Sequence, residues 1–453
     1  MLVFTAALLL PLPPGLSRSA TLAMAGLVAA VIFWASGVQD PAMTGLIIIT
    51  ALSALGVMRF AEATAGLGTE FVWLLAATFM IAQAMEDCGL GRRIALRILG
   101  MAGGHASTVL LACLVVVLVL SFMVPTAAGR IAMVLPICLG ILSAADIQGP
   151  SNFAKAVLIG VSHTSIMAGI GLATAAGATV YSVGAFGTLI GVRWTYVAWM
   201  TAFLPPVILF TLVLWRTQLW VFPPERANLV GSAEYVQAEL RRLGPLNGGE
   251  RRMLAVFAGV YILWIVGPEW GITTAQAGVM GAVALLLSGM RLLTWERAVA
   301  AVKWNVLIIF AVALALANAL ESSGAARWLT DATLAIFRHP RPVVVALVLT
   351  PLVLLMRVGF VNNLGMLAAG LPLIFTLARG WGLSPQWAGM IFVMAAGPGF
   401  LLPTQSPTGL ITLGYEYHTT ADYLRSGIPA SIALILLTWL AALFYWPLLG
   451  YGP

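Results

Sequence analysis

The sequence predicts an all-α polytopic membrane protein, and three observations support this class. Hydrophobic residues make up 61% of the 453 residues, charged residues make up 9%, and the mean hydropathy is +1.00. No soluble globular domain of this length has such a composition. Apolar runs long enough to cross a bilayer as helices recur along the whole chain. The period-2 alternation of a membrane β-barrel is absent from the sequence.

The first half of the chain combines predicted spans with one broken apolar run. The spans lie near residues 2–13, 19–36, 43–58, 70–86, 153–182 and 195–215. The amphipathic segment at residues 89–100 is expected to lie in the membrane interface. The broken run covers residues 106–145, and Arg130 is its only charged residue. A Pro-Thr-Ala-Ala-Gly-Arg break interrupts this run, and such a break needs protein or water around it.

The second half repeats this order after a polar segment. Residues 216–251 are charged and are predicted to form a cytoplasmic linker. Further spans lie near residues 252–267, 273–290, 303–320, 384–412 and 427–448. An interfacial stretch is expected at residues 321–332, and a second broken run covers residues 342–378. The linker therefore separates residues 1–215, with the first span and an N-terminal repeat, from a C-terminal repeat at residues 252–453.

The two broken runs are similar to each other. VPTAAGRIAMVLP in the first corresponds to GFVNNLGMLAAGLP in the second, and Thr126 and Asn362 precede a Leu-Pro pair by the same distance. This similarity indicates an internal repeat. If each run is a re-entrant hairpin, each repeat has an odd number of full spans, so the second repeat is inverted. The sequence thus predicts about 11 transmembrane helices plus two re-entrant helical hairpins, 106–145 and 342–378, in two inverted-topology repeats.

Charge and cysteine usage exclude other classes. The net charge is +7 and the pI is near 9.7, but the cationic residues cluster in loops, so they indicate topology rather than a nucleic-acid partner. With a cytoplasmic N-terminus, about twice as many of them fall inside as outside. The C-terminus is then outside. Cys88, Cys113 and Cys138 lack metal-ligand spacing and are expected to be free thiols.

The hairpin bends are the predicted binding site. The second arm of each hairpin begins with free N–H groups and a positive dipole end, which attract an anion. Thr126, Asn362 and Asn363 would add side-chain hydrogen bonds, and the two asparagines would also cap the following arm. We expect Thr126 and Asn363 to lie at two tips that approach each other near the midplane of the membrane.

Three further residues inside the predicted spans and hairpins could carry charge. We interpret Arg130 as an anion-binding residue; the alternative is an arginine that reaches the interface or a carboxylate. Arg357 ends the first arm of the second hairpin, where a structural cap and a substrate contact are equal alternatives. His163 could bind a coupling proton, although a neutral histidine bonded to a neighbouring helix is the simpler interpretation.

Longer segments of the chain resemble a known family. They are FVWLLAATFMIAQAMEDCGLGRRIALRIL, NFAKAVLIGVSHTSIMAGIG, ELRRLGPLNGGERRML, ALESSGAARWL and LLPTQSPTGLITLGYEYHTTADYLRSGIP. In this order and spacing they resemble the divalent anion/sodium symporter family of the ion transporter superfamily, whose members carry dicarboxylates, citrate and sulfate. The resemblance covers nearly the whole chain. It implies a small anionic substrate and a homodimer embedded in the lipid bilayer of the bacterial inner membrane.

The family carries Ser-Asn-Thr at both hairpin tips, where this motif contacts sodium and substrate. The corresponding residues here are Thr126, Ala127, Ala128, Asn362, Asn363 and Leu364. Of these, Asn363 alone matches the motif at its own position. Ala127, Ala128 and Leu364 supply no side-chain oxygen for a cation. The resemblance therefore implies anion transport, and Na⁺ remains a possible coupling ion on which we expect this chain to depend weakly or not at all.

A second family feature is a small-residue loop after each hairpin. In the second half the resemblance implies a substrate-binding loop formed by Thr404, Ser406, Pro407 and Thr408. In the first half the corresponding loop runs from Thr174 to Thr179, and these two threonines are candidate coupling residues.

These features favour a secondary active transporter that works by alternating access. The expected substrate is a di- or tricarboxylate, with sulfate or another oxyanion next, and the expected coupling is exchange or protons. The sequence has no P-loop and no HExxH motif, so neither ATP-driven transport nor an enzyme is expected, and no cofactor is predicted. The alternatives are an anion channel on the same scaffold and an intramembrane enzyme using the Ser-His-Thr-Ser cluster around His163.

Overall fold

The computed structural model describes residues 15–287, 289–290, 292–336 and 340–453. These residues form helices joined by turns, together with one isolated bridge between His105 and Asn228, so the predicted all-α class is confirmed. Within the described residues, nine helices are long and apolar enough to cross a membrane. The span predicted near residues 2–13 lies outside the described residues.

The helices follow the predicted order. Those of the first half are α2 (Arg18–Ser36), α3 (Pro41–Ala54), α4 (Phe60–Thr64), η1 (Ala65–Gly68), α5 (Glu70–Cys88), α6 (Leu90–Gly100), α7 (Ala106–Leu120), α8 (Ala127–Ala144), α9 (Asn152–Gly171), α10 (Gly177–Ile190) and α11 (Tyr196–Val221). The linker contains α12 (Ser232–Leu243). Those of the second half are α13 (Gly248–Val266), η2 (Gly267–Trp270), α14 (Thr274–Leu286), α15 (Trp295–Ala301), α16 (Trp304–Ser322), α17 (Ala325–Ile336), α18 (Pro342–Arg357), α19 (Asn363–Gly380), α20 (Pro385–Ala396), η3 (Pro403–Gln405), α21 (Pro407–Leu413), α22 (Thr420–Leu440), η4 (Ala441–Tyr445, a π-helical turn) and α23 (Trp446–Leu448).

Both broken runs form a helix, a bend and a second helix. Helices α7 and α8 make the first hairpin, and α18 and α19 make the second. Thr126 and Asn362 have extended backbone conformations directly before α8 and α19, respectively. Because a side-chain oxygen at this position can accept from the first free N–H groups, each residue begins its arm as an N-cap. The helix–bend–helix form predicted for both runs is therefore confirmed.

Two spans that the sequence predicted as continuous are interrupted in the structure. The predicted span at 153–182 divides into α9 and α10, which are separated by residues 172–176. The predicted span at 384–412 divides into α20 and α21, with a short 3₁₀ turn between them. Both interruptions fall in runs of small residues and, in the second half, of prolines that cannot continue a helix. The prediction of continuous spans was wrong, and the breaks coincide with the small-residue loops.

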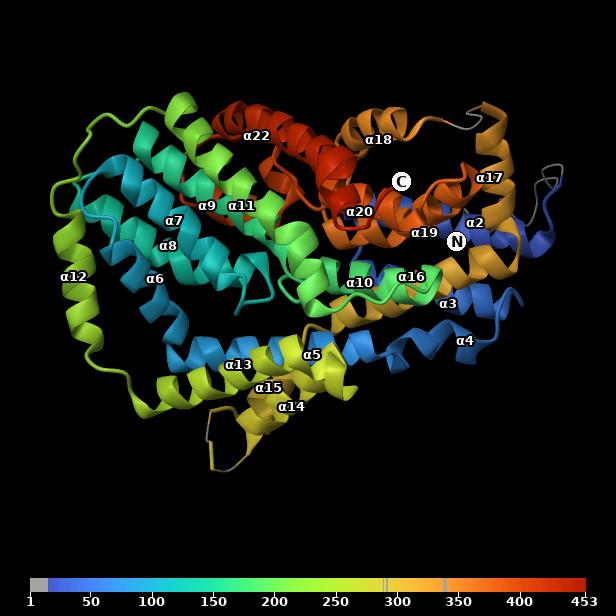
Figure 1. The fold of residues 1–453 in the computed structure, drawn as a ribbon, viewed down its shortest axis with the longest axis horizontal. Coiled ribbons are helices and arrows are strands. Elements are labelled where there is room, and N and C mark those ends of the chain that lie inside the picture. The colour runs from blue at the N-terminus through green and yellow to red at the C-terminus, as the bar shows by residue number, and fades with distance from the viewer. Residues whose placement is uncertain (1–14, 288, 291, 337–339) are drawn as a thin grey trace.

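Contacts divide most of the helices into two groups, which adjoin each other where α10 and α19 meet α16 and α2 (Figure 1). The scaffold helices are α2, α3, α5, α13, α14 and α16, which pack on one another. The hairpin group consists of α7 to α11 and α18 to α22. Figure 1 places α7 and α8 at the left and α18 and α19 at the right. Helices α6, α12 and α17 lie between the groups in the chain and connect them.

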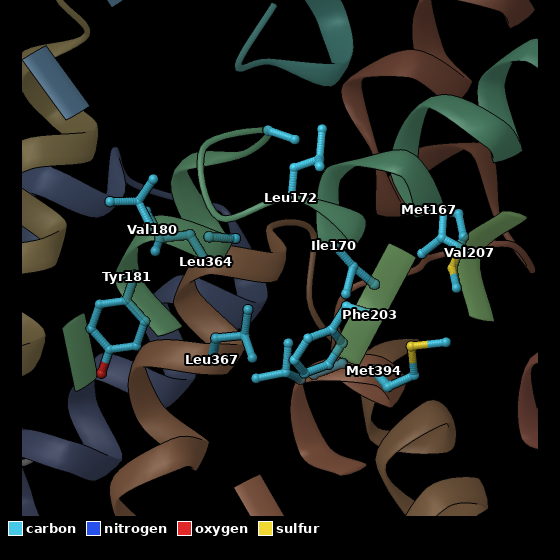
Figure 2. Packing of buried hydrophobic residues seen from close by; sticks show 14 of the residues in the cluster. Met167, Ile170, Leu172, Val180, Tyr181, Phe203, Val207, Leu364, Leu367 and Met394 are labelled. Carbon is cyan, nitrogen blue, oxygen red and sulfur yellow. The ribbon is translucent and has the colours of Figure 1, made fainter. Parts of the chain in front are cut away.

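Part of the interior of the hairpin group is apolar. Figure 2 shows side chains of the interrupted helices and of α11 and α19 packed together. Those labelled are Met167, Ile170, Leu172, Val180, Tyr181, Phe203, Val207, Leu364, Leu367 and Met394, and all are buried. The interrupted helix of the first half thus packs on the second hairpin, and Tyr181 also donates a hydrogen bond to the main-chain oxygen of Ala368 at 3.3 Å.

Candidate functional site

The bends are capped by their own side chains. Thr126 Oγ1 accepts a hydrogen bond from the N–H of Gly129 at 3.1 Å, and Asn362 Oδ1 accepts one from the N–H of Leu364 at 2.9 Å. Asn363 donates from Nδ2 to the main-chain oxygen of Gly397, at 3.4 Å, in the broken segment after α20. The second bend is therefore bonded to the interruption that follows it.

The residues after each cap differ in their surroundings. Ala127 and Ala128 are half-buried in the first turn of α8, and the main-chain oxygen of Ala127 accepts from Ser165 Oγ at 2.9 Å. Leu364 is buried in the first turn of α19, and Figure 2 shows it next to Val180 of α10. None of these three side chains brings an oxygen to its bend, as the sequence predicted.

Arg130 joins the first bend to the interrupted helix of the same half. Its side chain is completely buried, with 0% exposed. Nη1 donates to the main-chain oxygens of Val124, at 2.6 Å, and of Ala175, at 2.8 Å. Nη2 donates to the main-chain oxygen of Ser165 at 2.6 Å, and Nε donates to its hydroxyl at 3.3 Å. The guanidinium therefore bridges the bend, α9 and the loop before α10.

Arg357 makes the corresponding connection in the second half, with 2% of the residue exposed. Nη1 donates to the main-chain oxygen of Phe360, in the bend, and Nη2 donates to that of Gln405 at 2.6 Å. Gln405 returns a hydrogen bond from Nε2 to the main-chain oxygen of Arg357 at 3.1 Å. Its Oε1 accepts from the N–H groups of Leu401 and Leu402. The second bend is thus fastened to the segment that precedes α21.

The acceptors in the two bends are equivalent. Val124 lies two residues before the N-cap Thr126, and Phe360 lies two residues before the N-cap Asn362. Each main-chain oxygen accepts a hydrogen bond from a buried guanidinium.

The acceptors in the interrupted helices are equivalent as well. Ala175 directly precedes Ala176, the N-cap of α10, and Gln405 directly precedes Ser406, the N-cap of α21. In each half, one guanidinium therefore binds one carbonyl of the bend and one carbonyl at the start of the second half-helix.

The predicted loop of the second half is used largely for internal hydrogen bonds. Ser406 Oγ accepts from the N–H of Gly409 at 3.1 Å and lies 3.1 Å from Thr408 Oγ1. Ser162 of α9 donates to Thr408 Oγ1 at 3.0 Å, which links the two halves. Thr404 and Pro407 are exposed beside this network. The loop thus combines two exposed residues with two buried hydroxyls.

The candidate coupling residues are buried. Thr179 donates from Oγ1 to the main-chain oxygen of Gly169, across the interruption, and Thr174 is also buried. The His163 ring lies between the rings of Phe400 and Tyr423, with centroids 4.8 and 4.7 Å away. Among the described residues, neither ring nitrogen of His163 has a hydrogen-bond partner. The ring contacts of His163 are therefore aromatic, and its role stays a prediction.

Several contacts of the site were not predicted from the sequence. The carbonyls of Val124, Ala175 and Gln405 were not predicted as site groups. Every residue has a main-chain oxygen, so the residue type does not indicate which of them accepts from an arginine. Ser165 lies in the Ser-His-Thr-Ser cluster, yet its bond to Arg130 depends on how α9 packs against α8. In the part of the chain that the structure describes, no cluster of three or more His, Cys, Asp or Glu residues could hold a metal ion.

Two hairpins, each next to an interrupted helix, are the architecture of a secondary transporter whose site lies between discontinuous helices. Comparison with known families agrees. A family model, the sodium:sulfate symporter transmembrane region, matches residues 1–451, and the chain belongs to this family.

Individual relatives cover most of the chain. A "membrane protein" of Cupriavidus necator is 30% identical, with 98% of this chain and 90% of the relative covered. The sodium-dependent dicarboxylate transporter SdcS of Staphylococcus saprophyticus is 26% identical, covering 91% of this chain and 83% of that protein. The L-tartrate/succinate antiporter of Shigella dysenteriae is 26% identical, covering 85% of this chain and 80% of that protein. The second and third of these relatives are named as transporters.

A solved structure shares the fold. The crystal structure of the Alcanivorax borkumensis YdaH transporter, described as having an unusual topology, matches with a TM-score of 0.56 at 15% identity. The match covers 87% of this chain and 89% of that chain. At this identity the likeness concerns the fold alone, and it supports a polytopic helical fold.

Proposed function

We propose that this protein is a secondary active transporter that exchanges small anions by alternating access, without an obligatory sodium ion. The observation that carries the proposal is the repeated unit of a capped bend held against an interrupted helix by a buried guanidinium. Helix ends and unwound carbonyls at such places bind the substrate and the coupling ions of secondary transporters. The hairpin group would move as one body against the scaffold helices.

The proposed substrate is a di- or tricarboxylate, with sulfate or another oxyanion next. The names of two relatives support a carboxylate, because one is a dicarboxylate transporter and the other an L-tartrate/succinate antiporter. The family description supports sulfate as the second candidate. The candidate contacts are the capped arm starts at Thr126 and Asn362 and the exposed loop residues Thr404 and Pro407.

The occupied carbonyls support weak or absent sodium dependence. A sodium ion needs several oxygen ligands, and unwound main-chain carbonyls are the usual source in such transporters. Here the carbonyls of Val124 and Ala175 accept from Arg130, while those of Phe360 and Gln405 accept from Arg357. The tip residues Ala127, Ala128 and Leu364 offer no side-chain substitute. A guanidinium cannot leave with the substrate, so it gives positive potential without coupling to a sodium gradient.

The test is transport in proteoliposomes. Uptake of labelled succinate, citrate and sulfate is measured with and without a sodium gradient, and with and without unlabelled anion inside. We expect saturable uptake that requires internal anion and does not require sodium. An unsaturable flux without counterflow would contradict a carrier and favour the channel. A lack of transport of all three anions would contradict the proposed substrates. We also expect a homodimer, which the mass of the protein in lipid nanodiscs tests.

A further inference from the structure

We infer that Arg130 and Arg357 form one matched pair of permanent positive charges, and that the transported anion supplies the two negative charges that balance them. This inference rests on the proposed function and adds to it the charge state of the substrate and a role for Arg357. Guanidinium groups stay protonated in proteins, so each arginine contributes one full charge. Both are buried, and water therefore screens their fields little.

The pair is matched in space but not in sequence. Arg130 lies in the second arm of its hairpin, whereas Arg357 lies at the end of the first arm. When the bends are aligned by their N-caps, Met366 is the counterpart of Arg130, and Ser121 is the counterpart of Arg357. Repeat symmetry alone would have placed both arginines at one equivalent position. Two different positions instead deliver a guanidinium to equivalent carbonyls, which indicates that each bend requires a positive charge.

The residues of the hairpin group, all of which the structure describes, supply no buried carboxylate to balance this pair. In residues 106–221 and 342–448, which contain the hairpin group, the acidic residues are Asp146, Glu416 and Asp422. Asp146 and Glu416 are exposed, and Asp422 is paired with Lys155 at 3.0 Å. Among the ion pairs of the described residues, none includes Arg130 or Arg357.

The other cations of these ranges do not belong to the pair. Apart from Lys155, they are exposed, namely Arg193, Arg216, Arg379 and Arg425. The hairpin group therefore contains two buried positive charges without a carboxylate. A buried charge without a counter-charge is expensive inside a membrane, even when carbonyl dipoles surround it.

The charge count sets which states can cross the membrane. With a dianion bound, the two guanidiniums are balanced and the loaded group is neutral in the membrane. With a monoanion bound, one positive charge remains, and with no anion bound, two remain. Because each unbalanced charge raises the barrier to crossing, the dianion-loaded group moves and the empty group does not return. The result is exchange with selection by charge rather than by shape.

The experiment compares anions of similar shape that differ by one charge. Proteoliposomes are loaded with unlabelled succinate, and exchange is measured with labelled succinate or with its monoamide, succinamate, outside. Sulfate and methyl sulfate form the parallel pair. We expect the wild type to prefer each dianion by at least about tenfold. Arg357→Gln should lower this preference by at least about tenfold, because the monoanion then balances the one remaining charge.

Two further variants separate charge from structure. Arg357→Lys keeps the charge without the two-pronged guanidinium, and it should keep the dianion preference even at a reduced rate. Arg216→Gln removes an exposed arginine of α11 and should leave the preference unchanged. If Arg357→Gln fails to give a monodisperse protein, the dianion preference of Arg357→Lys becomes the test of the inference. An unchanged preference in a folded Arg357→Gln protein, or a lost preference in Arg357→Lys, would overturn the inference. Absence of anion exchange by the wild type would instead overturn the proposed function.

Discussion

Nη1 of Arg130 lies 2.8 Å from the main-chain oxygen of Ala175, and this contact joins the first hairpin to the loop between α9 and α10. Arg130 and Ala175 are far apart in the sequence and belong to different helical elements. The same guanidinium also holds Val124 before the bend. The position of the bend relative to α10 therefore depends on one buried side chain.

Loss of Arg130 should abolish or strongly weaken anion transport. Arg130→Ala removes one buried charge and leaves the main-chain oxygens of Val124 and Ala175 without their guanidinium donor, and each buried orphan costs about 1–3 kcal/mol. Arg130→Lys should restore transport partly, because an ammonium cannot reach all of these acceptors at once. Uptake of labelled succinate and the thermal stability of both variants are measured together. Wild-type kinetics in Arg130→Ala would assign this residue to neither binding nor coupling.

The salt bridge between Arg93 and Glu250 should be a stability element rather than a transport element. Arg93 Nε lies 2.7 Å from Glu250 Oε1, and both side chains are almost fully buried between α6 and α13. Removing one partner of a buried pair typically costs about 3–5 kcal/mol, because the other charge stays buried. Arg93→Ala should lower the unfolding temperature clearly. Arg92→Ala is the control, since Arg92 is half exposed and its pair with Glu239 should contribute below about 1 kcal/mol.

Much of the fold could be predicted from residue patterns. The Thr126 and Asn362 bends stand out because polar and small residues interrupt long apolar runs, and hydrocarbon does not tolerate loose backbone. The interruptions after Gly171 and Ala396 were harder to recognise as breaks in a helix. Ala, Gly and Leu occur on both sides of them, so the hydropathy of a broken helix equals that of a continuous one.

Only the side-chain groups of the site could be predicted from the sequence. Arg130 was selected because charge is rare in an apolar run, and Thr126 was selected because its type suits an N-cap. The acceptors of the guanidiniums are main-chain oxygens, which every residue has. Arg357 was assigned to two equal alternatives, because its contact with Gln405 depends on the packing of the second hairpin against η3.

The two tips should approach each other near the middle of the membrane. Each hairpin contacts an interrupted helix of the other half, because α8 packs on α21 and α19 packs on α10. This crossing would bring Thr126 and Asn363 toward one shared site. Paired spin labels at Ala128 and Leu364 test the distance in lipid nanodiscs. Tip labels too far apart to show a dipolar coupling would separate the two bends into independent sites.

His163→Gln should leave the pH profile of exchange unchanged. The His163 ring is fully buried and packed between the rings of Phe400 and Tyr423, and burial among aromatic rings disfavours a charge on it. The variant should slow exchange by disturbing this packing equally at each pH. Rates of succinate exchange between pH 5.5 and pH 8.5 are compared with those of the wild type. A pH dependence present in the wild type and absent from His163→Gln would make this histidine the proton-coupling group.

Exchange should proceed in sodium-free liposomes at the rate seen with sodium. Sodium coupling requires a site that fills with the substrate and empties with it, and carbonyl oxygens from unwound segments are its natural ligands. In this chain the carbonyls of Val124 and Phe360, one in each bend, already accept from a guanidinium that is covalently attached. Choline replaces sodium on both sides, and counterflow of labelled succinate is followed at several substrate concentrations. We expect the same maximal rate and the same half-saturation in both salts. Arg216→Gln, which alters an exposed cation outside the bends, should behave as the wild type does in both salts. Uptake that disappears in choline and rises steeply with sodium would mean that other oxygens of the two bends build cation sites beside the arginines.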